Sequence, residues 1–175
     1  MHISAGFLLM LSAMLLVVPL EWLAAFAVAA AVHEFCHFAA IRIVTGKASK
    51  LRLFSNGAKI KLPQMSAGRE AFCALSGPIG GLLLLPLAEH IPRIAICAGI
   101  QSVYNLIPVY PLDGGRALRC ATAMLLPPNV AAALCRGVEM FCVCGLFLLA
   151  VYGCIFLNLG MFPLLLALLM LIRVK

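Results

Sequence analysis

The sequence predicts an all-α, multi-pass membrane protein with about six transmembrane helices and a small β-hairpin on the cytoplasmic side. The chain has 175 residues, of which 65% are hydrophobic and 11% are charged, and its mean hydropathy is +1.12. Soluble globular domains usually carry about 25% charged residues. Because one spanning helix needs roughly 20 apolar residues, we expect a single membrane-embedded domain over residues 1–175.

Apolar runs separated by charge or proline predict the spans. The first run lacks the basic segment of a signal peptide, so we expect it to be retained. Short links between successive runs predict antiparallel neighbours. The expected spans cover residues 3–20, 22–45, 71–88, 93–110, 130–151 and 154–172.

The net charge of +7 could suggest nucleic-acid binding, but lysines and arginines in a membrane protein mainly mark the loops that face the cytoplasm. If both termini are cytoplasmic, every one of the 13 lysines and arginines except Arg93 lies inside or at the inner interface. The sequence therefore predicts cytoplasmic termini and no nucleic-acid partner.

The segment after the second run predicts the hairpin. Residues 51–54 and 59–62 alternate between apolar and basic side chains around Asn56-Gly57, a dipeptide favoured in tight hairpin turns. A solvated basic loop bound to anionic lipid is an open alternative. An exposed strand edge that pairs with an extended substrate is the other.

Small residues recur at four-residue spacing in Ser76-Gly77-Pro78-Ile79-Gly80-Gly81. This spacing favours close helix packing in lipid over direct chemistry, and the packing could hold the span against the one bearing His33. The eight cysteines form no CxxC pair, and we expect them to act as small hydrophobic residues. Arg136 and Glu139 predict an i,i+3 ion pair without a catalytic role.

The most informative motif is His33-Glu34-Phe35-Cys36-His37, which lies inside an apolar run. On a helix, His33 and His37 share one face and can bind one zinc ion. Glu34 is offset by about 100° and can act as a general base. A solvated helix surface could carry the same pattern by chance, but three polar side chains in a membrane span are costly without a purpose.

A catalytic zinc of this type needs a third protein ligand. Most of the other acids are excluded as ligands by their positions, because Glu21 and Glu89 lie at the outer links and Glu70 lies in the inner loop. Glu139 has an expected partner, so Asp113 is the remaining candidate. It follows a segment broken by prolines and precedes Gly114-Gly115, and at about 1.5 Å per residue it reaches a depth similar to that of His33. A helix cap paired with Arg116 is the alternative. Asn105 could hydrogen-bond backbone groups that the interrupted helix leaves unpaired, hold the substrate, or stabilise the oxyanion.

Three stretches, HEFCH, SGPIGG and Asn105 to Gly114 as NLIPVYPLDG, resemble in order and spacing the site-2 protease family of intramembrane zinc metalloproteases, over roughly residues 22–120. The chain looks like the compact sporulation-type members, which release a transcription factor from a membrane-tethered precursor. We expect it to lack the C-terminal nucleotide-sensing domain that many of them carry. The resemblance implies one Zn²⁺ per chain held by His33, His37 and Asp113. It also implies Glu34 as general base and Asn105 as a substrate-binding residue.

These expectations define a zinc metalloendopeptidase that cleaves in or near the transmembrane segment of a membrane-tethered protein. The expected location is a bacterial cell membrane, and the expected partners are the lipid bilayer, the tethered substrate and an inhibitory membrane protein. A catalytically inactive scaffold that binds tethered partners is the main alternative. A metal transporter would need further polar residues in its spans, and a zinc hydrolase acting on lipid stays open.

Overall fold

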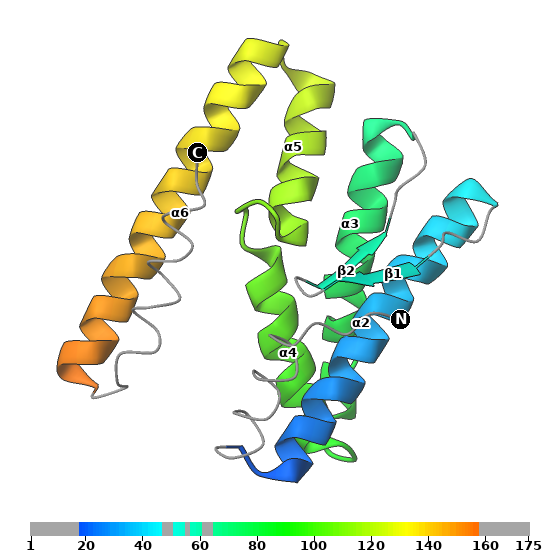
Figure 1. Ribbon diagram of the computed structural model, residues 1–175, viewed down its shortest axis with the longest axis vertical. Coiled ribbons are helices and arrows are strands. Elements are labelled where there is room, and N and C mark those ends of the chain that lie inside the picture. The colour runs from blue at the N-terminus through cyan, green and yellow to red at the C-terminus, as the bar shows by residue number, and fades with distance from the viewer. Residues whose placement is uncertain (1–17, 47–50, 55–56, 61–64, 158–175) are drawn as a thin grey trace. The chain divides into compact units, whose positions relative to one another are not determined.

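The computed structural model describes residues 18–46, 51–54, 57–60 and 65–157 (Figure 1). The chain divides into two compact units, residues 1–105 and 106–175, and each is described by itself. The prediction of one domain over the whole chain stays a prediction.

Two helices packed side by side form the centre of the first unit (Figure 1). Helix α2 covers Leu20–Thr45 and ends at Gly46, whose φ of 66° is the left-handed conformation that glycine adopts most easily. Helix α3 covers Ala67–Leu82. Alanine and cysteine side chains let the two helices approach closely, and the buried cluster between them contains Ala40, Ile41 and Cys73.

Two short strands lie between α2 and α3 in the sequence. Strands β1, Leu51–Phe54, and β2, Gly57–Ile60, pair antiparallel, with Leu51 opposite Ile60 and Phe54 opposite Gly57. The structure therefore has paired strands where the sequence predicts a hairpin, but the second strand covers residues 57–60 and not 59–62. Gly57, expected in the turn, begins β2 instead. The side of the membrane on which the strands lie stays a prediction.

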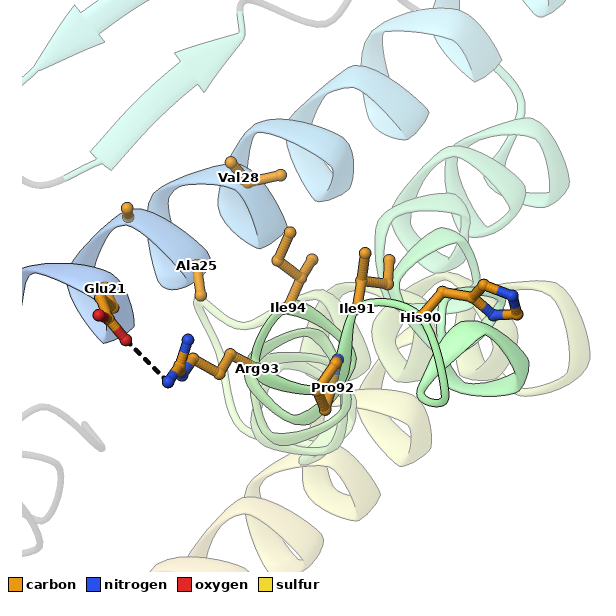
Figure 2. Close-up of a pocket in the computed structure, with 9 residues that line it drawn as sticks. Glu21, Ala25, Val28, His90, Ile91, Pro92, Arg93 and Ile94 are labelled. Carbon is orange, nitrogen blue, oxygen red and sulfur yellow. Dashed lines mark ion pairs between the residues drawn. The ribbon is translucent and has the colours of Figure 1, made fainter.

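Helix α4, Pro92–Leu106, follows α3 after a short 3₁₀ turn, η1, at Leu85–Leu87. The first turns of α2 and α4 meet at one end of the unit, where the Arg93 guanidinium pairs with the Glu21 carboxylate at 2.7 Å (Figure 2). The sequence prediction placed both residues on the outer side, and their contact is consistent with a shared side.

The second unit is a helical pair. Helix α5 covers Asp113–Leu125 and helix α6 covers Pro128–Phe156, and the two helices contact each other. Near their connection, the Thr122 hydroxyl lies 3.2 Å from Cys135 Sγ. None of the eight cysteines forms a disulfide bond.

The structure corrects the predicted spans. Among the described residues, three helical segments are long and apolar enough to cross a membrane: Leu20–Thr45, Ala67–Leu87 and Pro128–Phe156. The expected span 93–110 is wrong, because α4 has 15 residues and would rise only about 22 Å of a roughly 30 Å core. The expected break at residues 152–154 is also wrong, because α6 continues through it. Span 3–20 and most of span 154–172 lie outside the described residues.

Helix α5 was not predicted at all. Its 13 residues include Asp113, Arg116, Arg119 and two glycines, which lower its hydropathy below that of a span. Its apolar residues gather on one face instead, as in an amphipathic helix. The three long apolar helices and the composition fit an integral membrane protein.

Candidate metal centre

Helix α2 places the two histidines of the HEFCH motif together inside the first unit. Both residues are buried, with 3% of the surface of His33 and 6% of that of His37 exposed. Their rings meet edge to face with centroids 4.8 Å apart, and the two Nε2 atoms are 3.2 Å apart. The predicted pairing of these side chains on one helix face is confirmed.

Helix α3 orients His37. The Cys73 carbonyl lies 2.7 Å from His37 Nδ1, and because a carbonyl only accepts, Nδ1 carries the proton of this bond. The Ser76 hydroxyl donates to the same carbonyl at 2.7 Å and lies 3.4 Å from Nδ1. A proton on Nδ1 leaves the lone pair of a neutral His37 on Nε2, which faces His33. This is the support that metal-binding histidines usually have.

Gly77 provides the room for the two imidazoles. A Cβ atom at this position would lie 2.6 Å from His37 Cε1 and 2.8 Å from His33 Nε2, and closer still to His37 Nε2. One turn later, a Cβ at Gly80 would collide with Cys36 of α2, and one at Gly81 with Ser102 of α4. The prediction that the small residues of SGPIGG allow close helix packing is therefore confirmed, and Gly77 additionally borders the histidine pair.

The histidine pair fits a zinc ion. Zinc binds imidazole nitrogen at about 2.0–2.1 Å in tetrahedral sites, so two such nitrogens should be about 3.3 Å apart. The observed Nε2 separation is 3.2 Å. The rings are buried, rigidly supported and directed at a common point bordered by Gly77. These features match a metal site better than they match a solvated helix surface.

Glu34 follows His33 directly in α2 and is half-buried. One residue of offset turns its side chain by about 100° from that of His33. The carboxylate is therefore carried by the same rigid helix as the histidine pair without sharing its face, which is the position predicted for a general base.

Asp113 belongs to the second unit, where it is the first residue of α5. It is 8% exposed, and its Oδ1 lies 3.7 Å from Arg116 Nη1, so the contact with Arg116 that belonged to the alternative interpretation exists. Asp113 is not the residue that caps the helix, because Leu112 occupies that position. The predicted interruption of the chain before Asp113 is confirmed, since α4 ends at Leu106.

Asn105 lies near the end of α4 and is half-buried. Its Nδ2 donates to the Gln101 carbonyl at 3.0 Å, so in this state it bonds backbone of its own helix. The sequence left open a bond to backbone freed where the helix is interrupted, but the Gln101 carbonyl lies inside α4. Binding of substrate or of an oxyanion stays a prediction.

The predicted ion pair of Arg136 with Glu139 is wrong. Arg136 is exposed on α6, and the Glu139 carboxylate pairs instead with Arg119 of α5 at 2.8 Å. The i,i+3 spacing correctly suggested a partner for Glu139, but the contact between two helices provides a different one.

A hollow of about 330 Å³ lies between the first turns of α2 and α4, away from the histidine pair. Figure 2 shows its lining, which is mostly apolar and includes Glu21, His90 and Arg93. Among these lining residues, the carboxylate of Glu21 is paired with Arg93 and His90 is the one histidine. The lining of the hollow therefore does not include the histidine pair of α2.

Comparison with known proteins gives a likeness in fold. No protein-family model and no curated protein matches the chain. Among solved structures, the chain is similar to the Site-2 Protease from Methanocaldococcus jannaschii, with a TM-score of 0.63 and 19% sequence identity. The match covers 97% of this chain and 86% of that chain. At this identity the likeness establishes a shared fold.

Proposed function

We propose that the chain is an intramembrane zinc metalloprotease that hydrolyses a peptide bond in or near the transmembrane segment of a membrane-tethered protein. The observation that carries the proposal is the buried histidine pair of α2, whose Nε2 atoms are 3.2 Å apart in a helix of membrane-spanning length. Charged or polar groups in such helices usually serve function. The fold shared with a Site-2 Protease supports the same reaction class.

The proposed metal ligands are His33, His37 and Asp113, with one zinc per chain. Each residue is buried and offers one ligand atom, two imidazole nitrogens and one carboxylate oxygen. This donor set suits a catalytic zinc, which takes three protein ligands and keeps a fourth position open. When bound, zinc supplies Lewis-acid polarisation of the scissile carbonyl and makes water a stronger nucleophile.

The chain's own residues supply the remaining chemistry. Glu34 takes a proton from the attacking water and returns it to the leaving amine. The Cys73 carbonyl holds His37 in the tautomer that presents Nε2. Asn105 sits at the end of α4, and exchanging its bond to Gln101 for one to substrate backbone would let it hold the substrate.

A helical substrate must unwind before its carbonyls can be reached, and the β1–β2 pair offers a place for the unwound strand. Within the described residues the sheet has two strands, so each strand has one edge whose backbone groups are not paired within that sheet. Addition of the substrate as a third strand would satisfy its backbone without demanding one sequence.

The finer identity is the compact, sporulation-type enzyme of a bacterial membrane. Its substrate would be a membrane-tethered transcription-factor precursor, and an inhibitory membrane protein would control it. We infer that both termini lie in the cytoplasm. The support is the order of the three motifs and the distribution of basic residues, which leaves Arg93 alone on the outer side.

Zinc content per purified chain in detergent tests the proposal without a substrate. We expect about one zinc in the wild type and in Glu34→Gln, because Glu34 is not a ligand, and a clear loss in Asp113→Ala. Absence of zinc from a folded wild-type protein would overturn the metalloprotease proposal and favour the inactive scaffold. Full retention by Asp113→Ala would remove Asp113 from the ligand set.

A further inference from the structure

Glu139 is a buried carboxylate on the longest apolar helix of the described chain. Its residue is 4% exposed, and α6 has the highest hydropathy of the three membrane-length helices. An ionisable group in such a helix is costly unless it is paired and usually marks a function. The proposed reaction assigns no role to Glu139.

One oxygen of Glu139 joins three parts of the second unit. Glu139 Oε1 accepts hydrogen bonds from Arg119 Nη2 at 2.8 Å and from Arg119 Nε at 3.2 Å. The same oxygen accepts the backbone N–H of Tyr110 at 3.4 Å. Arg119 lies in α5, whereas Tyr110 lies in the connection between α4 and α5. The carboxylate of α6 thus contacts both the connection and the helix that follows it.

Arg119 contacts the same connection through a second surface. Its guanidinium carbon lies 4.2 Å from the centroid of the Tyr110 ring, a cation–π distance. A planar guanidinium can stack on a ring and donate from its edge at once, which a lysine ammonium cannot do. Tyr110 is therefore held at its backbone by Glu139 and at its ring by Arg119.

The held connection leads directly to Asp113. Backbone hydrogen bonds run from Val109 N–H to the Ile107 carbonyl at 2.7 Å and from Leu112 N–H to the Val109 carbonyl at 2.9 Å. Gly115 packs on the same stretch so closely that a Cβ atom would lie 2.6 Å from the Val109 oxygen. The connection is held by its own backbone hydrogen bonds and packs closely against α5. Contacts that fix the position of Tyr110 therefore also fix the start of α5.

We propose that Glu139, acting through Arg119 and Tyr110, is a positioning residue that sets the place of Asp113 as a metal ligand. This inference rests on the proposed zinc site and deepens it. The network holds the peptide stretch that ends at Asp113, as outer contacts hold metal ligands elsewhere. It also explains why a costly buried carboxylate lies in α6.

The test measures zinc affinity by competition with chelators of graded strength. We compare wild type, Glu139→Gln, Arg119→Lys and Arg119→Gln, with Arg136→Gln as the matched control, because Arg136 is an exposed arginine of α6. We expect about 10- to 100-fold weaker zinc binding for Glu139→Gln and Arg119→Gln, the usual effect of losing an outer contact. Arg119→Lys should fall between them and wild type, and Arg136→Gln should bind as wild type does.

The same substitutions are repeated in an Asp113→Ala background, which distinguishes positioning from general destabilisation. If Glu139 acts through Asp113, its replacement should change zinc affinity less than about 3-fold once Asp113 is absent, because coupled residues are not additive. If Glu139→Gln does not fold, zinc affinity is compared between wild type and the two Arg119 variants. The Arg119 side chain is 46% exposed, so its replacement should disturb folding less.

Two outcomes would overturn the inference while leaving the proposed function intact. One is wild-type zinc affinity in both Glu139→Gln and Arg119→Gln. The other is an equal loss with and without Asp113, which would make the network a structural element only. Absence of zinc from the wild type would instead overturn the proposed function, so the two failures are distinguishable.

Discussion

Replacing Gly77 with alanine should displace the histidine pair. The new Cβ would lie 2.6 Å from His37 Cε1 and closer still to His37 Nε2, whereas ordinary van der Waals contact begins at 3.4 Å, so the imidazole or α3 must shift by at least about 0.8 Å. Metal sites tolerate about 0.2 Å in ligand distance. Overpacking of this kind costs about 1–3 kcal/mol, which corresponds to zinc binding weaker by about 5- to 150-fold if the imidazoles move.

Zinc competition titration of the purified protein in detergent measures this loss, and two glycines provide controls. Gly137→Ala introduces the same methyl group in α6 with nothing within 4 Å, so zinc affinity should not change. Gly80→Ala presses on Cys36 instead of on the imidazoles, so it should lower thermal stability more than zinc affinity. Zinc affinity of Gly77→Ala within about 2-fold of wild type would refute the reasoning that the pair occupies this space.

Ser76→Ala removes one donor to the Cys73 carbonyl but leaves the hydrogen bond from His37 to that carbonyl. Zinc affinity should therefore fall only about 2- to 10-fold, as expected for one hydrogen bond. A larger loss in the same titration would mean that Ser76 itself orients the His37 ring. Arg93→Ala breaks an ion pair whose side chains are 55% and 67% exposed, so unfolding in detergent should change by less than about 1 kcal/mol with zinc affinity unaltered. Glu34→Gln should retain zinc and lose cleavage of a membrane-tethered substrate in proteoliposomes, and full cleavage would remove Glu34 as the base.

Local patterns in the sequence were sufficient for the membrane class and for the histidine pair. Composition indicates a lipid environment, because a chain with 11% charged residues has too few polar side chains to form a water-facing surface. The spacing of His33 and His37 reports one helix face, because the helical period is a property of the backbone. The prolines between Asn105 and Asp113 likewise marked the end of α4.

Predictions from hydropathy failed for helices whose length differs from that of a membrane span. Helix α5 contains two arginines and Asp113 and was missed, because these charged residues interrupt its apolar residues, which therefore form no continuous run. A short link was expected at residues 152–154, yet α6 passes through it, since glycine is tolerated in apolar helices.

The partners of the polar side chains depended on tertiary structure. His37 bonds a carbonyl 36 residues away, and Glu139 pairs with Arg119, 20 residues away, although Arg136 is nearer in sequence. Gly77 could be predicted as a close-packing residue, but its contact with both imidazoles requires the pairing of α2 with α3. The sequence by itself determined which side chains repeat on one helix, because that periodicity is local. Only the packing of helices decided which of them meet, because such contacts depend on how whole surfaces fit together.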